Sequence, residues 1–160
     1  MDTFDTPIDD RYFEDYRPGA TYEFADTITV DGPRMIEFAT EFDPQPFHVD
    51  PAADSPFGGL IASGWHTAGI MMRLFADNYL SRVASLASPG VDEMRWLVPV
   101  RPGDTLRLRT TVLDAKRSKS KPDRGIVRTR VEVLNQRDEI VMTVVATNFM
   151  RLRDPGLPSS

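Results

Sequence analysis

TEFDPQPFHVDP, residues 40–51, is the stretch around which the rest of the chain is organised. It opens a segment, residues 43–59, that contains four prolines and two glycines. Proline fixes φ and removes a backbone donor, so this composition excludes a long helix or a central strand. We therefore expect residues 43–59 to form one long loop, and ordered loops of this length are frequently functional.

Upstream of this loop, the sequence predicts one strand and one short helix. Residues 21–30 are rich in Thr, Val, Ile and aromatic side chains, a composition typical of strands. Asp31 can cap a helix that carries Pro33 in its first turn. The apolar side chains that follow recur at helical spacing, and we expect this helix to end at Pro44.

Downstream of the loop, the sequence predicts a long helix and then four strands. Ser63 offers an N-cap, and from Gly64 to about Leu80 apolar side chains surround most of the helix, which predicts burial. Four later segments have strand composition and are separated by turn signals: residues 91–98, 105–115, 126–134 and 140–150. The expected fold class is α+β, with an antiparallel sheet wrapped around one long central helix, because each must bury an apolar face.

The composition is that of one globular domain without disulfides. The chain has 160 residues, 41% of them hydrophobic, and no cysteine, so disulfides, thiolate metal sites and thiol catalysis are excluded. With two histidines in the chain, we expect no metal site and no other cofactor. We expect a single domain over residues 1–160, with residues 1–12 and 154–160 mobile.

Charge and hydropathy narrow the class of partner and the compartment. A net charge of -5 argues against a protein that neutralises a nucleic-acid backbone, so no nucleic-acid partner is expected. No apolar run is long enough to span a bilayer, and the acidic N-terminus lacks the features of a signal peptide. We therefore expect a cytoplasmic protein with no membrane partner.

Three stretches carry a resemblance to a known family. FATEFDPQPFHVDP, residues 38–51, resembles the hydratase motif of MaoC-like proteins, the R-specific enoyl-CoA hydratase type, whose centre reads Asp-x-Asn-Pro-x-His. GLIASG, residues 59–64, is similar to the family's lead into its central helix, and VDEMRWLVPVRPG, residues 91–103, to its aromatic-Pro-Val-x-x-Gly strand. The similarity spans nearly the whole chain. It implies a hotdog fold and, as substrate, a trans-2-enoyl-CoA or a related acyl thioester.

The resemblance also implies roles for individual residues and a mode of assembly. It makes Asp43 and His48 the catalytic pair, and it makes the backbone N–H of Gly64 the oxyanion donor. It further implies a homodimer or higher homo-oligomer in which two subunits join their sheets, with the acyl-CoA near the interface.

The chain departs from the family pattern at three positions. Phe42 stands where family members usually carry Gly, and glycine reaches backbone conformations that phenylalanine avoids. Gln45 stands where Asn is usual and keeps the amide one methylene longer, and Ser63 stands where His is frequent. We expect Gln45 and Ser63 to bind the substrate.

The same residues can perform the chemistry of hydration. Water must be held over C3 and give up a proton, C2 must be protonated, and the enolate-like charge must be stabilised. Asp43 and His48 lie on a proline-stiffened loop and can converge on one water molecule, one accepting its proton while the other orients it. Gly64 begins the long helix, where free N–H groups and the helix dipole favour negative charge.

Other polar and aromatic residues have simpler explanations. We expect Asp50 to cap a turn at Pro51 rather than to act in catalysis. His66, at the start of the long helix, competes with His48 for the catalytic role, and packing against the core is the favoured interpretation. Trp96 can belong to the core or to a wall of the acyl pocket, and the sequence does not separate these.

Residues 116–124 (KRSKSKPDR) form a basic run between two predicted strands. Such runs are most often solvated hairpin tips, which is the favoured interpretation here. The alternative is that Lys119 and Lys121 hold the phosphates of CoA and steer the ligand towards its site.

Three functions stay open on the sequence alone. The first is an acyl-CoA hydratase or dehydratase that interconverts a trans-2-enoyl-CoA and a (3R)-3-hydroxyacyl-CoA. The second is a hotdog acyl-CoA thioesterase, and the third is a non-catalytic acyl-CoA-binding subunit. The spacing of Asp43 and His48 favours the first.

Overall fold

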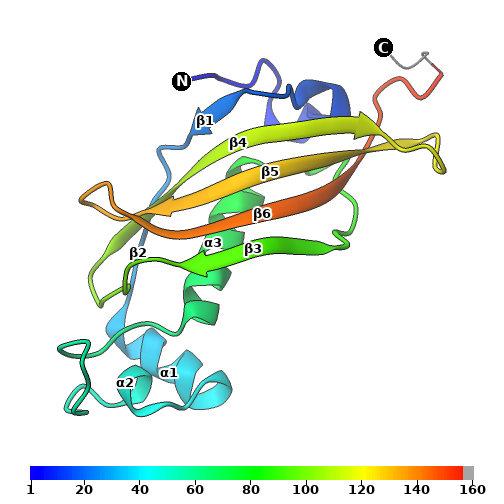
Figure 1. Ribbon diagram of the computed structural model, residues 1–160. Helices are drawn as coiled ribbons and strands as arrows, with labels where there is room; N and C mark the ends of the chain where they lie inside the picture. Colours follow the sequence, from blue (N-terminus) through cyan, green and yellow to red (C-terminus); the bar gives the residue numbers. More distant parts are fainter. Residues whose placement is uncertain (157–160) are drawn as a thin grey trace.

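One antiparallel sheet curves around a central helix in this computed structural model, which describes residues 1–156 (Figure 1). The central helix is α3 (Gly64–Asn78), which lies across one face of the sheet. Along the sheet the strands follow the order β1 (Thr21–Glu23), β4 (Thr105–Arg117), β5 (Arg124–Leu134), β6 (Ile140–Arg151) and β3 (Gly90–Trp96), and β2 (Ile28–Thr29) pairs with the start of β4. The predicted α+β architecture is confirmed.

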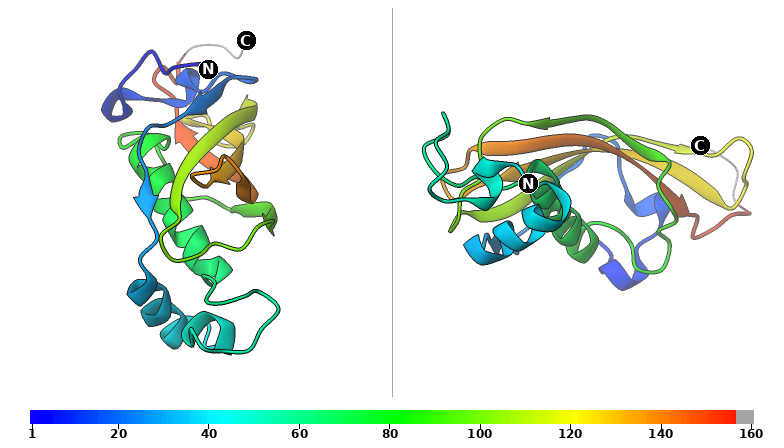
Figure 2. Two further views of the ribbon diagram at one scale, coloured as in Figure 1. Left: turned by 90° about the vertical axis from the view of Figure 1, so that its left-hand side faces the viewer. Right: turned by 90° about the horizontal axis from the view of Figure 1, so that it is seen from below.

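The sheet has a buried concave face and an outer face in contact with solvent. Seen from below, it arches over α3 (Figure 2). In β4, Leu106, Leu108 and Val112 are fully buried, whereas Arg107 and Arg109 between them keep part of their surface in solvent. This alternation arises because successive side chains of a strand point to opposite faces of the sheet.

Helix α3 is buried along one side only. Ser63 caps it as predicted, since its Oγ accepts a hydrogen bond from the Trp65 N–H at 3.3 Å. Leu74 and Phe75 face the sheet and are almost fully buried. The expectation of burial around most of the helix is wrong, because Trp65 is 59% exposed and Met72 is 46% exposed. A single sheet covers one side of a helix and leaves the opposite apolar side chains at the surface.

The predicted strand over residues 21–30 is broken into β1 and β2. Glu23 is paired with Arg109, and Ile28 is paired with Leu106. The four residues 24–27 therefore face only two residues of β4 and must leave the ladder. This difference in length depends on how two distant segments pair, so the composition of residues 21–30 alone could not predict the break.

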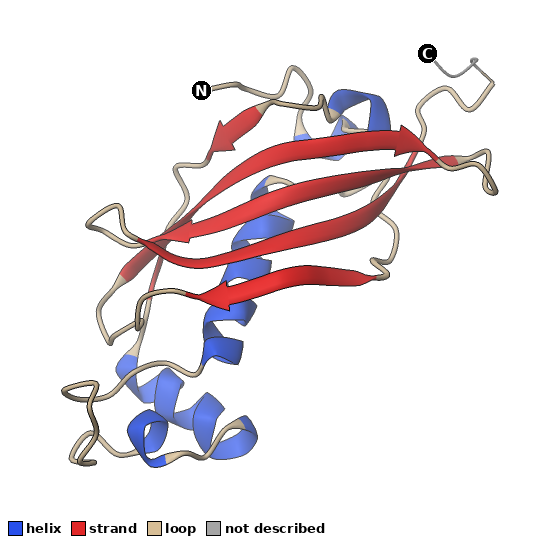
Figure 3. Cartoon of the chain, in the orientation of Figure 1, coloured by secondary structure: helices blue, strands red, loops and turns tan. Residues whose placement is uncertain are grey.

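Helices α1 (Gly32–Phe42) and α2 (Pro46–Val49) lie together at one end of the molecule, next to the start of α3 (Figure 3). The side chain of Asp31 accepts a hydrogen bond from the first turn of α1, which confirms the predicted cap. The expected long loop, residues 43–59, contains the single turn of α2, because Pro46 at a first helical position loses no hydrogen bond. Within residues 1–156, no helix combines the length and the apolar character that crossing a bilayer would require.

The first twelve residues, expected to be mobile, pack against the sheet and the far end of α3. The ring of Phe4 stacks on that of Tyr22, with 4.0 Å between centroids, and the Arg11 guanidinium lies 3.5 Å above Phe4. Arg11 is only 5% exposed. These two side chains anchor an otherwise polar segment. At the other end, residues 154–156 are exposed, and the rest of the stretch expected to be mobile, residues 157–160, lies outside the described residues.

Candidate active site

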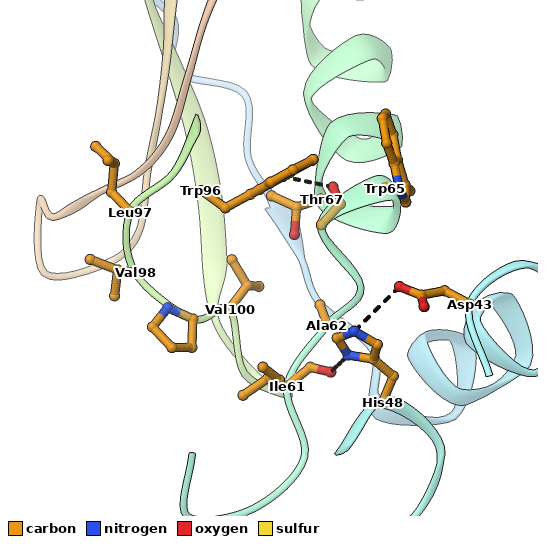
Figure 4. A pocket seen from close by; sticks show the side chains of 12 residues that line it. Asp43, His48, Ile61, Ala62, Trp65, Thr67, Trp96, Leu97, Val98 and Val100 are labelled. Carbon is orange, nitrogen blue, oxygen red and sulfur yellow. Dashed lines mark hydrogen bonds and ion pairs between the residues drawn. The ribbon is translucent and has the colours of Figure 1, made fainter. Parts of the chain in front are cut away.

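A cavity of about 310 Å³ opens at the N-terminal end of α3 (Figure 4). Asp43 and His48 stand on one side of it, and the segment that follows β3, residues 97–100, forms the other side. The start of α3 contributes Gly64 and Thr67. The structure therefore brings the predicted catalytic pair and the predicted oxyanion donor to one cavity.

The geometry of His48 fixes the role of each ring nitrogen. Its Nδ1 lies 2.8 Å from the carbonyl oxygen of Ile61, and because a carbonyl only accepts, Nδ1 carries a proton. Its Nε2 lies 3.3 Å from Oδ2 of Asp43 (Figure 4). In the neutral imidazole Nε2 is therefore the acceptor, directed at Asp43 and the cavity. His48 is 6% exposed, so its ring is held in place by its surroundings.

Asp43 is held by two side chains that the sequence assigned to the substrate. Gln45 Nε2 donates to Oδ1 at 2.7 Å, and Ser63 Oγ donates to Oδ2 at 2.7 Å. The hydrogen bond from Gln45 lowers the pKa of the Asp43 carboxyl below its usual value. Partial burial raises this pKa, but the hydrogen bond from Ser63 and the nearby His48 lower it further. Asp43 is therefore ionised near neutral pH. The substrate-binding role of Gln45 and Ser63 stays a prediction, since their polar atoms contact Asp43.

Gly64 is packed so tightly that no larger residue fits. The Trp96 Nε1–H donates to the Gly64 carbonyl at 2.9 Å, and a Cβ on Gly64 would come within 2.5 Å of the indole ring. Within residues 1–156, the Gly64 N–H makes no hydrogen bond. It is therefore a donor at a helix N-terminus beside the cavity. Trp96, left open between core and pocket wall, is 43% exposed and forms part of the wall.

Comparison with known proteins agrees with this geometry. The family model described as MaoC like domain matches residues 14–135. The chain belongs to the MaoC-like dehydratase family. The chain is 33% identical over 159 residues to the mesaconyl-CoA hydratase of Cereibacter sphaeroides, which covers 93% of this chain and 43% of that protein. The chain thus spans less than half the length of that relative.

Solved structures place the MaoC-like chain among hotdog folds. A MaoC-like dehydratase from Rhodospirillum rubrum is 42% identical, with a TM-score of 0.82 over 89% of this chain and 98% of that one. The R-hydratase PhaJ1 from Pseudomonas aeruginosa is 25% identical, with a TM-score of 0.68 over 88% and 84% of the two chains. A double-hotdog protein from Mycobacterium tuberculosis shares the fold at 17% identity and a TM-score of 0.72, over 96% and 48%. The predicted hotdog fold is confirmed.

Phe42 does not distort the site of this MaoC-like chain. It is the last residue of α1, so its backbone is helical and needs no glycine. Among residues 1–156, the only non-glycine residues with positive φ are Glu93 and Asp138. The Phe42 side chain is 64% exposed and its ring packs against that of Phe38. The departure from the family pattern therefore leaves the position of Asp43 intact.

Sequence reasoning missed Thr67, which lines the cavity and is 2% exposed. Its N–H donates to the carbonyl of Ser63, one turn earlier on the same side of α3. A polar residue four positions after the N-cap of a helix that starts at a site is the signal that could have found it. Asp50 caps a turn as predicted, accepting a hydrogen bond from the Ala52 N–H at 2.9 Å.

The remaining candidates lie away from the cavity. His66 faces a separate groove, where its ring meets Phe38 edge-on at 5.0 Å and partial burial lowers its pKa. Lys119 and Lys121 lie at the tip between β4 and β5, at the opposite end of the sheet (Figure 1). Among residues 1–156, no group of three or more His, Asp or Glu side chains could hold a metal ion. Within one chain, the site therefore consists of Asp43, His48 and the start of α3.

Proposed function

We propose that this protein reversibly adds water to a trans-2-enoyl-CoA and forms a (3R)-3-hydroxyacyl-CoA. The observation that carries the proposal is the convergence of Asp43, His48 and the Gly64 N–H on one cavity. A related hydratase acts on mesaconyl-CoA by name, and solved relatives include an R-hydratase. Water addition transfers protons and no electrons, so these side chains suffice without a redox cofactor.

Asp43 and His48 divide the handling of water. A water molecule on the cavity side of this pair could hydrogen-bond to both Nε2 of His48 and Oδ2 of Asp43, since the two atoms are 3.3 Å apart and border the cavity. One group takes a proton as the oxygen attacks C3, and the other accepts a hydrogen bond from the second O–H, which turns a lone pair of that oxygen towards C3. The proton then returns to C2 of the substrate, so the protein is unchanged at the end of the cycle.

The start of α3 stabilises the charge that develops on the thioester. As water attacks C3, electrons move through C2 to the thioester oxygen and give an enolate. The Gly64 N–H is unpaired within residues 1–156 and lies at the positive end of the α3 dipole. A donor directed at a developing oxyanion contributes roughly a hundred- to a thousand-fold in rate.

A single assay with crotonyl-CoA tests the proposal. Loss of enoyl absorbance without release of free thiol, and a product of (3R) configuration, is the expected result. Thiol release would instead indicate a thioesterase, and binding of crotonyl-CoA without either change would indicate a non-catalytic subunit. Either of these outcomes would overturn the assignment.

We further propose that residues 1–160 act as one domain and that two copies form a dimer through β3. This strand is an edge of the sheet, and Val91, Trp96 and Leu97 along it and at its end are exposed apolar side chains. An open apolar edge is a pairing surface that a monomer would have to protect. Sedimentation equilibrium at micromolar concentration should give about twice 18.0 kDa or a higher multiple. A fully active species at 18.0 kDa would refute the interface.

A further inference from the structure

The hairpin between β4 and β5 concentrates positive charge in an acidic protein. We call residues 116–124 the basic hairpin; it contains five Lys and Arg side chains against Asp123 alone. Lys119 and Lys121 are exposed, and within residues 1–156 neither has a carboxylate at salt-bridge distance. The whole chain has a net charge of -5, so this local concentration of cations is unlike the remaining surface. Unpaired exposed cations of this kind attract anions such as phosphates.

Within one chain, the basic hairpin is too far from the cavity to serve it. The cavity lies at the C-terminal end of β3, where Trp96 pairs with Met142 of β6. The basic hairpin ends at Arg124, the first residue of β5, which pairs with Arg151. Met142 and Arg151 are nine residues apart along β6, or roughly 30 Å at about 3.3 Å per residue. The strand directions thus put the cavity and the hairpin of one chain at opposite ends of the sheet (Figure 1).

The two edges of the sheet differ, and only one is open to a second copy. At the β1 edge, Thr21 exchanges hydrogen bonds with Asp2, whose N–H donates to the Thr21 carbonyl at 2.9 Å and whose carboxylate accepts at 2.8 Å. At the β3 edge, within residues 1–156, the only β3 backbone groups that bond to anything other than β6 are those of Gly90, which bond to the Ser88 hydroxyl. A two-fold axis through the middle of β3 pairs this strand with itself in antiparallel orientation. Such a pairing reverses the partner's sheet end for end.

We propose that the basic hairpin of each subunit binds the phosphates of the CoA ester held in the cavity of its partner. The end-for-end reversal brings the partner's hairpin to the end of the sheet where this chain has its cavity. The partner's β5 then lies three strand spacings from β3, or roughly 14 Å at about 4.8 Å each, within reach of an extended pantetheine arm. The inference rests on the proposed acyl-CoA hydratase function and names the residues that hold its nucleotide.

In this arrangement one subunit carries out the reaction and the other binds the nucleotide of the substrate. The thioester reacts beside Asp43 and His48 of one subunit, whereas Lys119 and Lys121 of the other contact only the nucleotide. Contacts to the nucleotide lie far from the reacting atoms and are equally strong in the ground state and the transition state. Losing such contacts raises KM and leaves kcat unaltered. Exposed phosphate contacts are also screened by salt.

The first experiment reverses the charge of the hairpin with Lys119→Glu and Lys121→Glu in the full chain. We expect KM for crotonyl-CoA to rise about ten-fold at low ionic strength, with kcat unchanged, because uniform binding is lost. KM for crotonyl-pantetheine, which lacks the nucleotide, should not change. The matched control is Arg17→Glu with Arg82→Glu, two exposed arginines outside the hairpin, which should leave both KM values as they are. An unchanged KM for crotonyl-CoA in the hairpin variant would overturn the proposal.

The second experiment asks whether the hairpin acts on its own cavity or on the partner's. Two differently tagged chains are coexpressed, one carrying Asp43→Asn and the other carrying the reversed hairpin, and the mixed dimer is purified. In the mixed dimer, the only intact cavity belongs to the chain with the reversed hairpin, and its partner supplies an unaltered hairpin. We expect about half the wild-type kcat at the wild-type KM, as for one complete site in two.

Different outcomes would refute the role of the basic hairpin and the hydratase function. A mixed dimer that keeps the raised KM shows that the hairpin serves its own chain, and the contribution across the interface is then wrong. Wild-type protein that does not hydrate crotonyl-CoA at all refutes the hydratase function itself, independently of the hairpin. A wild-type enzyme that hydrates normally while the mixed dimer fails to restore KM refutes only the inference.

Discussion

The two ends of α3 handle their free backbone groups in opposite ways. At the N-terminal end, the Gly64 N–H is left without a partner among residues 1–156 and borders a cavity. At the C-terminal end, the Arg11 guanidinium donates to the carbonyls of Asn78 and Tyr79 at 2.9 and 3.0 Å, and the Tyr16 hydroxyl donates to the Tyr79 carbonyl at 2.7 Å. Both ends use side chains from distant parts of the chain. Only one end keeps a hydrogen-bonding group available.

The difference indicates which end supports folding and which end supports chemistry. Burial raises the pKa of the Tyr16 and Tyr79 hydroxyls, so both stay neutral at any physiological pH. At the other end, Asp43 is ionised and Nε2 of His48 faces it, both at the border of a cavity. Polar groups that are buried and hydrogen-bonded to each other stabilise a structure, whereas a site requires groups that can exchange partners. Changes at the two ends should therefore affect different observables.

The largest expected effect comes from removing the proton-transfer groups at the cavity end. Asp43→Asn and His48→Ala should each lower kcat/KM for crotonyl-CoA by about a hundred- to ten-thousand-fold, the contribution of general acid-base catalysis. The circular dichroism spectrum should stay that of the wild type, since neither side chain belongs to the hydrophobic core. Glu41→Gln, at an exposed position of α1, is the matched control and should keep full activity. A folded variant at either position with more than about a tenth of wild-type kcat/KM would remove that residue from the mechanism.

The next effect comes from the closed end of α3. Arg11→Met should lower the free energy of unfolding by about 2–4 kcal/mol, because the carbonyls of Asn78 and Tyr79 lose a charged donor and Phe4 loses its cation. Activity per folded molecule should be preserved. Arg17→Met removes an exposed arginine and should change the unfolding midpoint little. A loss of kcat/KM at full folding in Arg11→Met would show that the two ends are not independent.

A smaller effect is expected at Ser63, which both caps α3 and donates a hydrogen bond to Asp43. Ser63→Ala removes one hydrogen bond to Asp43 and the cap of α3, so we expect about 1 kcal/mol of lost stability. The hydrogen bond from Ser63 is one of the interactions that lower the pKa of Asp43, so its loss raises that pKa. The acidic limb of the kcat/KM profile should therefore move to higher pH. Ser63→Thr keeps the hydroxyl and should restore the wild-type limb, and a limb that stays in place in Ser63→Ala would contradict the assignment to Asp43.

The smallest effect is expected at the second histidine. His66→Gln should change kcat/KM by less than about two-fold, because His66 faces a groove on another side of α3 and makes no contact with the Asp43 carboxyl. A pH profile of this variant is the more stringent measurement. If the acidic limb of the kcat/KM profile disappeared in His66→Gln, then His66 and not His48 would be the catalytic histidine.

The local features of the fold could be predicted from the sequence. The caps at Asp31 and Ser63 were predicted because a capping side chain and its donor lie within three residues of each other. The strand at residues 105–115 was predicted from its composition, and β4 spans Thr105–Arg117. The break at residues 24–27 could not be predicted, because it depends on the length of β4 opposite them.

The sequence predicted which residues form the candidate site, but not which partners orient them. The motif spacing identified Asp43 and His48, and the helix start identified Gly64. The partners that orient these groups are distant in sequence: the Ile61 carbonyl fixes the His48 tautomer, and the Trp96 indole packs on Gly64. Periodicity and composition carry no information on such pairs, which depend on how the segment after β3 crosses the start of α3.

The strand order has a consequence for synthesis of the chain on the ribosome. β3 is translated before β4, β5 and β6, yet its partner in the sheet is β6, the last of the four to emerge. Until β6 is available, Val91 and Trp96 of β3 have no strand to lie against, and the nascent chain exposes an apolar segment with unpaired backbone groups. Contacts between segments far apart in the chain form slowly, and such segments are exposed to aggregation in the meantime. We therefore expect β3 to be the segment that chaperones bind during translation.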